Sequence, residues 1–237
     1  MSSTRLPGKV LMDLGGMPVI DHVISRALRV HRADAVVVAT TTEPGDDALA
    51  AHVEALGVPV TRGDLNDVLS RYALAAHDSN AEVVVRITSD CPLIDPAVID
   101  ATIAAFRQSP EVDYCANTLV RTYPIGMDTE VFSREALERA HAEASQPHER
   151  EHVTPYLYQH PELFRLRNVE APERERWPTL RLTVDESADL EMLQALLGHA
   201  SADAGLGELL AVLRSHPEIA THNAGVTHRH VEKPQDW

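Results

Sequence analysis

The chain has 237 residues, of which 44% are hydrophobic and 24% are charged, and its formal net charge is −15. This length suits one large α/β domain with a full core, and the acidic balance argues against a nucleic-acid partner, which needs a basic surface to displace counterions. No apolar stretch approaches the ~20 residues of a membrane span. No signal peptide is visible, so we expect a cytoplasmic enzyme that makes no membrane contact.

Short apolar runs alternate with amphipathic helical patterns along the chain. In chain order these patterns predict a helix at 18–28, a strand at 35–40, a helix at 46–56, a strand at 58–60, a helix at 65–77, a strand at 83–88, a helix at 96–106, a strand at 114–116, a helix at 133–144, a strand at 180–184, and helices at 187–197 and 206–213. The runs at 35–40 and 83–88 are almost continuously apolar, which is typical of strands buried on both faces. Cys91 and Cys115 lie near such runs, and we expect buried, reduced thiols.

This alternation predicts right-handed βαβ units and a mostly parallel twisted sheet with helices on both faces. We expect residues 1–237 to form a single domain. The stretch from about 117 to 177 departs from the alternation, and we expect it to form a lobe over the cleft. Ligands of such sheets bind at the carboxyl ends of the strands, where the sequence places both Asp90 and Asp185.

A small basic loop opens the chain. A loop that approaches a triphosphate needs small residues and cations, which Arg5, Gly8 and Lys9 provide. The match to a Walker A loop fails, because the first glycine is missing and no Ser or Thr follows Lys9. A solvated basic loop without a ligand is the alternative.

Asp90 and Asp185 are candidate ligands of a divalent metal. Mg²⁺ prefers carboxylates together with phosphate oxygens, and one or two protein ligands are usual. The alternative is that each aspartate caps the turn or helix that follows it. Asp95 is better explained as a cap, since Pro96 follows it at the first helical position.

Residues 148–152 match the H-E-x-x-H pattern of zinc proteases. Pro147 and Pro155 bracket the segment tightly, and no convincing third ligand is placed. Because 13 of the 237 residues are histidine, we regard this match as coincidence.

The loop comes where a doubly wound domain normally has a buried strand. No apolar run precedes Ser3. We therefore expect the first strand of the sheet to lie upstream of residue 1.

Five segments of the chain resemble the spore-coat polysaccharide type of cytidylyltransferase, which belongs with the CMP-sugar synthetases for ketodeoxyoctonate and acylneuraminate. They are S-S-T-R-L-P-G-K-V-L at 2–11, V-R-I-T-S-D-C-P-L-I-D-P at 85–96, G-M-D-T-E-V-F at 126–132, E-R-E-H-V-T-P-Y at 149–156 and L-T-V-D-E-S-A-D-L-E at 182–191. The resemblance runs over nearly the whole chain, with the motifs in order.

The resemblance implies a sheet of the nucleotide-diphospho-sugar transferase type and a homodimer. It also implies transfer of a nucleotide from CTP, or another nucleoside triphosphate, to a hydroxyl of a small acidic sugar-like acceptor, with release of pyrophosphate. The catalytic residues implied are Arg5 and Lys9, and the metal ligands, for Mg²⁺, are Asp90 and Asp185. The nucleotide-binding residues implied are Ser3, Thr4, Gly8, Thr40, Thr41, Thr42 and Arg86. The acceptor-binding residues implied are Asn117, Asp128, Glu130, Arg150 and His152.

The chain departs from the family pattern in two places. The first strand of the family, with the arginine that follows it, is missing, and Ser89 stands where the group usually has glycine. Two alternatives therefore stay open. One is a nucleotide-binding or partner protein of the same fold without catalysis, and the other is a transferase that uses a different nucleotide or a non-sugar acceptor such as a phosphonate.

Overall fold

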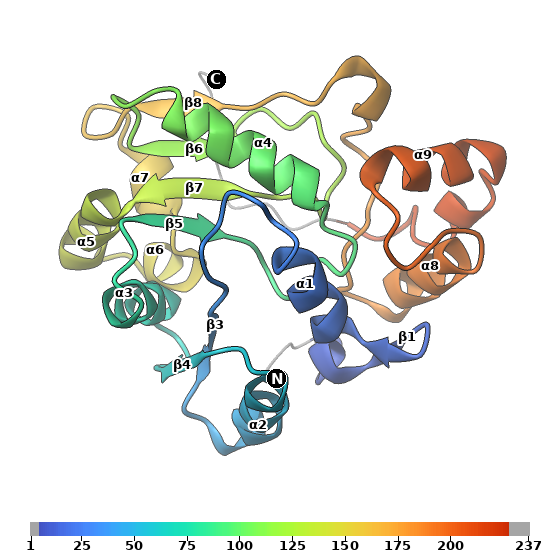
Figure 1. The fold of residues 1–237 in the computed structure, drawn as a ribbon, viewed down its shortest axis with the longest axis horizontal. Helices are drawn as coiled ribbons and strands as arrows, with labels where there is room; N and C mark the ends of the chain where they lie inside the picture. Colours follow the sequence, from blue (N-terminus) through green and yellow to red (C-terminus); the bar gives the residue numbers. More distant parts are fainter. Residues whose placement is uncertain (1–4, 228–237) are drawn as a thin grey trace.

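The computed structural model describes residues 5–227 (Figure 1). The strands are β1 (Asp13–Leu14), β2 (Met17–Pro18), β3 (Val38–Thr41), β4 (Val60–Gly63), β5 (Val83–Arg86), β6 (Tyr114–Ala116), β7 (Glu130–Ser133) and β8 (Leu166–Asn168). The α-helices are α1 (Val19–Ala27), α2 (Asp47–Ala55), α3 (Val68–Asp78), α4 (Pro96–Arg107), α5 (Arg134–Glu143), α6 (Pro147–His152), α7 (Pro155–Gln159), α8 (Ser187–Leu197) and α9 (Leu206–Ser215). All the helices that the sequence predicts are present.

The main sheet is mixed: three of its four strands run in one direction, as the expectation of a mostly parallel sheet requires, but one strand between them is antiparallel. Its strand order is β5-β7-β6-β8, in which β7 runs antiparallel to both β5 and β6, while β6 and β8 are parallel. The reason is β7, which the sequence patterns do not predict and which inserts between β5 and β6. Both β7 and β8 come from the range 117–177, so part of the expected lobe belongs to this sheet.

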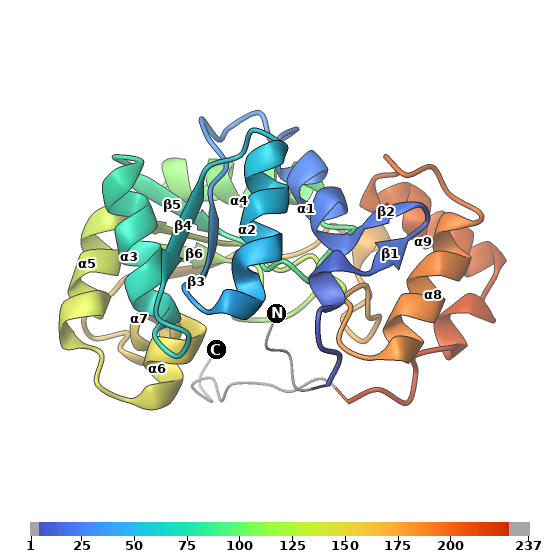
Figure 2. The ribbon, with the colours of Figure 1, turned by 90° about the horizontal axis from the view of Figure 1, so that it is seen from below.

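Helices cover both faces of the main sheet, as predicted. Tyr114 and Phe132 on neighbouring strands point to one face, where α5 and α7 pack. Cys115 and Val131, the adjacent positions, point to the opposite face and pack against α4. Side chains on successive strand residues alternate between faces, so each strand contributes to both layers. Figure 2 shows α5 and α6 at one end of the molecule and α8 and α9 at the other.

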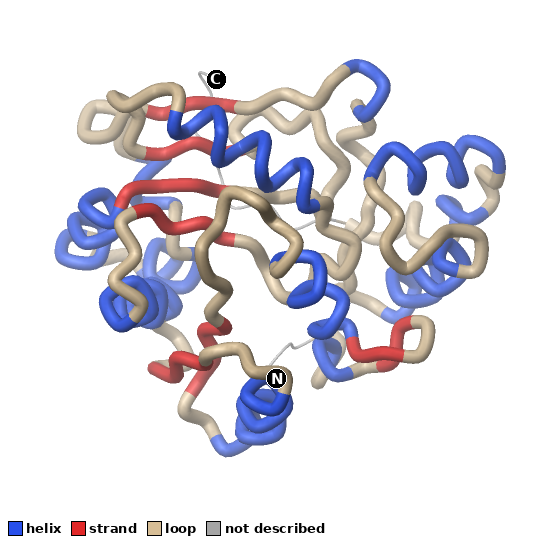
Figure 3. The backbone as a smooth tube through the Cα atoms, viewed as in Figure 1, coloured by secondary structure: helices blue, strands red, loops and turns tan. Residues whose placement is uncertain are grey.

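A second, separate pair of strands lies beside the main sheet. β3 and β4 are parallel and start their pairing at Val38 and Val60. Figure 3 shows this pair and the four-stranded sheet as distinct groups. The sequence predicts β3 and β5 as fully buried strands, but all four residues of β5 and the first two of β3 are only half-buried. The physical reason is that the edges of β3 and β5 that face each other are not paired.

The segment at 180–184 is extended but does not form the predicted strand. Within residues 5–227, its only ladder contact is an isolated bridge between Ile125 and Arg181. Its backbone bonds two loops instead: Leu182 N–H donates to Ile125 O at 2.7 Å, and Val184 N–H donates to Asp90 O at 2.8 Å. These bonds fix the approach of the chain to Asp185.

Other local predictions are confirmed. Oδ1 of Asp95 accepts from the N–H of Ala97 at 2.8 Å, which makes Asp95 the N-cap of α4. Cys91 and Cys115 are buried and free. Among the described residues, no helix combines the length and the hydrophobicity that a membrane span requires.

Candidate active site

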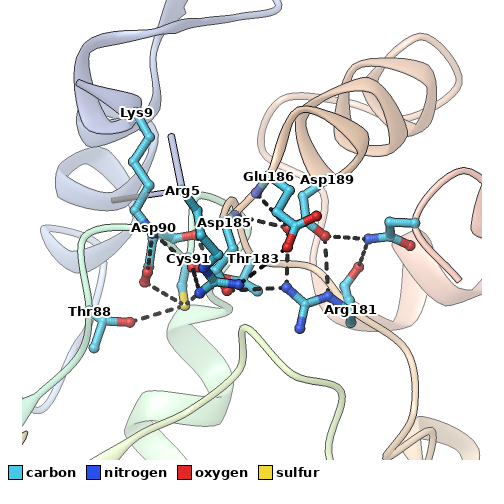
Figure 4. A network of polar contacts seen from close by, with 11 residues as sticks. Arg5, Lys9, Thr88, Asp90, Cys91, Arg181, Thr183, Asp185, Glu186 and Asp189 are labelled. Carbon is cyan, nitrogen blue, oxygen red and sulfur yellow. Dashed lines mark hydrogen bonds and ion pairs between the residues drawn. The ribbon is translucent and has the colours of Figure 1, made fainter. Parts of the chain in front are cut away.

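Lys9 joins two acidic side chains that come from distant parts of the chain (Figure 4). Its Nζ lies 2.7 Å from Oδ2 of Asp90 and 3.0 Å from Oδ1 of Asp185. Gly8 precedes it with a φ of 72°, a left-handed conformation that glycine adopts without steric cost. The structure therefore brings Asp90 and Asp185 together at the Lys9 loop.

Asp185 has further cationic neighbours. Its Oδ1 lies 2.8 Å from Nη2 of Arg5, and its Oδ2 accepts from Nη2 of Arg181 at 3.1 Å. Burial on its own would raise the pKa of Asp185, but Lys9, Arg5 and Arg181 outweigh it and lower the pKa. Burial also opposes the charge on Lys9, yet the two aspartates outweigh it and raise the pKa of Lys9. Both groups are thus charged at neutral pH.

Asp189 positions Asp185 through hydrogen bonds to the backbone. Its Oδ2 accepts from the backbone N–H groups of Asp185 at 2.9 Å and Glu186 at 3.1 Å, within a capping box at the start of α8. Its carboxylate also accepts from Arg181 and from Nδ2 of Asn223. The Asp189 side chain is fully buried, so this network is a fixed support rather than a ligand contact.

The backbone of Asp90 is docked onto the extended segment that leads to Asp185. Asp90 O accepts from Oγ1 of Thr183 at 3.0 Å as well as from the N–H of Val184. The next residue, Cys91, has its Sγ 3.2 Å from Oγ1 of Thr88. Two loops far apart in sequence are therefore fixed side by side.

The two carboxylates suit Mg²⁺, which in nucleotide sites takes one or two carboxylates plus phosphate oxygens. Within residues 5–227, no group of three or more His, Cys, Asp or Glu side chains is arranged to hold a metal ion. A metal bound by Asp90 and Asp185 would thus need additional ligands, such as the phosphate oxygens of a bound nucleotide.

The H-E-x-x-H segment serves a different purpose. Oε2 of Glu149 accepts from the backbone N–H groups of Ser145 at 2.9 Å and Gln146 at 2.8 Å, which caps α6. His148 is exposed and its Nε2 lies 3.1 Å from Oε1 of Gln159. The geometry agrees with the interpretation of this motif as coincidence.

A cavity of about 450 Å³ adjoins Lys9, and we call it the Lys9 cavity. Its polar lining consists of Gly8, Lys9, Thr40, Thr41, Asp46, Arg71, Arg86, Thr88, Ser89, Glu151 and His152. Thr40 and Thr41 donate their hydroxyls to Oδ2 of Asp46 at 2.6 and 2.7 Å. Burial would raise the pKa of Asp46, but its hydrogen bonds, these two among them, outweigh burial and lower the pKa. Thr42 is exposed and is not part of the lining.

Arg71 is a residue of the Lys9 cavity that sequence reasoning missed. Its side chain is 8% exposed, and its buried Nε has no hydrogen-bond partner among the described residues. It lies against Gly63, where an added Cβ would come within 2.7 Å of its Cγ. A buried arginine with an unpaired donor in a cavity wall is a signal that only the structure provides.

A second cavity, of about 360 Å³, adjoins the first, and we call it the Asp128 cavity. Both cavities are lined by Arg86, Thr88 and His152, and the Asp128 cavity is also lined by Arg5, Asp90 and Asp185. The carboxylates of Asp90 and Asp185 therefore line the Asp128 cavity and contact Lys9, which lines the other cavity.

The Asp128 cavity contains paired charges. Asp128 accepts two hydrogen bonds from Arg121, at 2.6 and 2.7 Å, a partner that the sequence did not indicate. Glu130 pairs with Arg86 and accepts from Oγ1 of Thr154 at 2.7 Å. Burial lowers the pKa of His152 despite the charge of Glu151, so its imidazole is neutral at neutral pH.

The structure does not bring every predicted residue to these cavities. Asn117 is buried and spans two backbone groups, with Nδ2 donating to Met127 O and Oδ1 accepting from Thr129 N–H. Arg150 pairs with Asp67 and lines neither cavity. Ser3 and Thr4 lie outside the described residues.

The chain has an α/β fold of the nucleotide-diphospho-sugar transferase type. A structure of a CMP:2-keto-3-deoxy-manno-octonic acid synthetase complexed with CTP has the same fold, with a TM-score of 0.62 and 22% identity over 83% of this chain and 94% of that chain. The family model for cytidylyltransferases matches residues 1–219, and the chain belongs to this family.

Two relatives match over almost the whole chain. The chain is 36% identical over 229 residues, 93% of each chain, to the spore coat polysaccharide biosynthesis protein SpsF of Bacillus subtilis. A cytidylyltransferase structure from Leptospira borgpetersenii is 33% identical, has a TM-score of 0.87, and covers 97% of this chain and 95% of that chain. The family resemblance drawn from the sequence is confirmed.

Proposed function

We propose that this protein transfers CMP from CTP to a hydroxyl of a small sugar-like acid and releases pyrophosphate. The observation that carries the proposal is the position of Lys9, whose Nζ contacts both Asp90 and Asp185 where the two cavities adjoin. In the proposal the Lys9 cavity receives CTP and the Asp128 cavity receives the acceptor. The CTP-bound synthetase of the same fold supports this choice of nucleotide.

In the proposal, Lys9 and Arg5 bind the triphosphate of CTP. Lys9 and Arg5 neutralise Asp185 in the absence of a ligand, and both side chains can turn to phosphate oxygens when a nucleotide enters. Asp90 and Asp185 would then hold Mg²⁺, which supplies positive charge next to the reacting phosphate. Lys9 offsets the negative charge that develops on the leaving pyrophosphate.

In the proposal, the Asp128 cavity orients the reacting hydroxyl of the acceptor. Its oxygen forms a bond to the α-phosphorus of CTP while the bond from that phosphorus to the pyrophosphate oxygen breaks, and the hydroxyl proton passes to water. Because the protein forms no covalent bond to the substrates in this proposal, the rate enhancement comes from positioning the reactants and neutralising charge. We assign Asp128, Glu130 and His152 to acceptor binding on account of their place in the cavity wall.

The direct test is release of pyrophosphate from CTP, Mg²⁺ and a panel of sugar acids, with ATP, UTP and GTP run in parallel. Release with CTP and at least one acid, lost in Asp185→Asn, would support the proposal. If calorimetry shows that CTP binds but no acceptor yields pyrophosphate, the alternative of a non-catalytic nucleotide-binding protein is favoured. Release with another nucleotide, or with a phosphonate, would overturn the assignment of substrate.

The non-catalytic alternative has one observation in its favour, which is that β3 and β5 are not joined into a single sheet. The relation to SpsF suggests a role in surface polysaccharide synthesis. A homodimer and a cytoplasmic location remain predictions, for which light scattering and cell fractionation are the measurements.

A further inference from the structure

Among the described residues, three polar side chains line both the Lys9 cavity and the Asp128 cavity, namely Arg86, Thr88 and His152. In the proposed reaction the acceptor hydroxyl meets the α-phosphorus of CTP where the two cavities adjoin. A group that takes the hydroxyl proton has to lie within hydrogen-bond reach of that point. A guanidinium offers no lone pair and a threonine hydroxyl is a very weak base, so of these three only the imidazole of His152 can accept the proton.

The imidazole of His152 has its proton-accepting capacity free. The residue is half-buried, and within residues 5–227 neither of its ring nitrogens makes a hydrogen bond. Burial is the largest influence on its pKa and lowers it; Arg86 and His148 lower it further, and Glu151 raises it. The net shift is downward, so at neutral pH the ring is uncharged and holds a lone pair.

The carboxylates of the Asp128 cavity are all engaged already. Both oxygens of Asp128 accept from Arg121. Glu130 accepts from Oγ1 of Thr154 and pairs with Arg86. The two remaining carboxylates of this cavity are the proposed metal ligands. None of the four therefore offers an oxygen as free as the ring nitrogens of His152.

The remaining titratable groups near the acceptor hydroxyl are not suitable bases. The Cys91 thiol and the Tyr158 hydroxyl line the Asp128 cavity, and burial raises the pKa of each, so both keep their protons at neutral pH. Glu151 lines the Lys9 cavity but not the Asp128 cavity. Among the described residues of the acceptor cavity, His152 is thus the base that is left.

A strained turn follows His152 directly. Val153 has a φ of 74° and a ψ of −57°, and the N–H of Thr154 donates to His152 O at 2.9 Å. These values describe the γ-turn with positive φ, which is rare and strained, and strain is greater for a β-branched residue. The Val153 side chain is fully buried, so packing keeps the turn in place. Backbone strain of this kind is concentrated at functional sites.

Contacts on both sides of the γ-turn fix the position of His152. Before it, Arg150 of α6 pairs with Asp67, which caps the start of α3. After it, Oγ1 of Thr154 donates to Glu130 of β7 at 2.7 Å. The backbone around His152 is therefore tied to two other elements, whereas the imidazole itself is left free to contact a substrate.

We propose that His152 is the general base of the transfer. A ring nitrogen of His152 takes the proton of the acceptor hydroxyl as that oxygen bonds to the α-phosphorus of CTP. The bond from this phosphorus to the pyrophosphate oxygen breaks, and its electron pair leaves on pyrophosphate. The imidazolium then gives the proton to water. This inference rests on the proposed function and adds proton removal to the place of His152 in acceptor binding.

The test compares His152→Ala with the wild type in the pyrophosphate assay, with an acid that the wild type uses as acceptor. kcat is expected to fall by about 10²- to 10⁴-fold, the usual contribution of a general base. The Kd for CTP and the Tm should stay within about twofold and about 2 °C of the wild type, because the imidazole acts on the proton and not on the nucleotide.

Two further readouts separate proton transfer from a structural role. Imidazole added to the buffer should raise the rate of His152→Ala at least about tenfold, since it can occupy the vacated space and accept the proton. His77→Ala, which removes an exposed histidine at the end of α3, is the control and should keep the wild-type rate with no gain from imidazole.

The pH profile is the second readout. Because protonated histidine cannot act as a base, the ratio of kcat/KM between the wild type and His152→Ala should shrink as the pH falls through the pKa of His152, which lies below 6.5. Taking the ratio cancels the ionisation of the substrates. Glu151→Gln should move this fall to lower pH, because the charge of Glu151 raises the pKa of His152.

A His152→Ala protein that keeps more than about a third of the wild-type kcat would overturn the role of His152 and leave the transferase standing. So would a loss of rate that neither imidazole relieves nor pH changes. If His152→Ala lowers the Tm by more than about 5 °C, His152→Gln, which keeps much of the side-chain volume, is judged by the same pH ratio. A wild type that releases no pyrophosphate with any nucleotide and acid would reject the proposed function and this inference with it.

Discussion

At the scale of single residues, Lys9 is the side chain on which the site depends. Its side chain is 12% exposed, and its ammonium group lies between two carboxylates whose charges would otherwise repel each other. The residues that flank Asp90 and Asp185 in the sequence do not reveal this contact with Lys9. The same ammonium contacts both proposed metal ligands, so its loss affects charge balance and phosphate binding together.

Lys9→Met is expected to lower kcat/KM for pyrophosphate release by about 10²- to 10³-fold, because a preorganised charge at the leaving group is lost. The measurement is the pyrophosphate assay in protein shown to be active. Arg29→Met is the matched control, since Arg29 pairs with Asp203 on the surface. A Lys9→Met protein as active as this control would contradict the assignment.

The pH dependence of stability provides a second expectation for Lys9. The pKa of Lys9 lies above 10.5, so its stabilising effect is complete below that pH and is lost as the pH rises through the folded-state value. The pKa of Asp185 lies below 3.8, so its effect is complete above that pH and is lost as the pH falls through the folded-state value.

The difference in unfolding free energy between the wild type and Lys9→Met should therefore be constant from about pH 6 to 9 and shrink on either side. Urea denaturation over pH 3 to 11 is the measurement. A difference that stays unchanged at both extremes would show that the ion pairs do not contribute.

Arg71 offers a test of the Lys9 cavity. Arg71→Met should raise the Kd for CTP by about 10- to 100-fold, the usual cost of one charged hydrogen bond. Gly63→Ala should act in the same direction, because its Cβ would displace the Arg71 side chain. Isothermal titration calorimetry measures both, again with Arg29→Met as control. Unchanged CTP affinity in both variants would remove Arg71 from the binding site.

At the scale of elements, the start of α8 fixes Asp185. Asp189 caps this helix and at the same time binds Arg181, which in turn contacts Asp185. Asp189→Ala should lower the unfolding free energy by about 3–5 kcal/mol, because it leaves the buried Arg181 charge with one carboxylate fewer.

Urea denaturation of Asp189→Ala is read against Glu191→Ala, an exposed residue on the same helix. That control should change stability by less than about 0.5 kcal/mol. If the two variants are equally stable, the buried network does not support the site. Asp189→Asn, which keeps one oxygen at the helix start, is expected to fall between them.

The sequence was a good guide to the helices and a poorer one to the strands. Helices such as α4 have both periodicity and a cap, Asp95, that acts through local geometry. The strands β7 and β8 are only four and three residues long, too short for a two-residue period to stand out. The run at 180–184 has strand-like composition, but its partners are loops, which no local pattern reveals.

At the scale of the whole molecule, the sequence correctly predicted that Asp90 and Asp185 meet, from the rule that parallel strands end at a common edge, although the segment before Asp185 does not form such a strand. It could not find Arg71, Arg121 or Asp189, whose importance comes from burial and from partners far away in the chain. It also assigned Arg150 to the acceptor site from a motif, whereas the structure gives that arginine to Asp67.

The site is assembled from the whole length of the chain. Arg5 and Lys9 come from its beginning, Asp90 from the loop before α4, and Asp185 from the turn before α8. No single helix, strand or loop carries all of these residues, so they form a binding site only in the folded chain. Binding of a nucleotide should therefore stabilise the entire fold.

The most direct test of the account is a crystal structure with CTP and Mn²⁺ in place of Mg²⁺, read by anomalous scattering. We predict an anomalous peak about 2.1 Å from carboxylate oxygens of both Asp90 and Asp185, with the triphosphate beside Lys9 and the cytosine in the Lys9 cavity. A triphosphate bound elsewhere, or a metal that touches neither aspartate, would contradict the account.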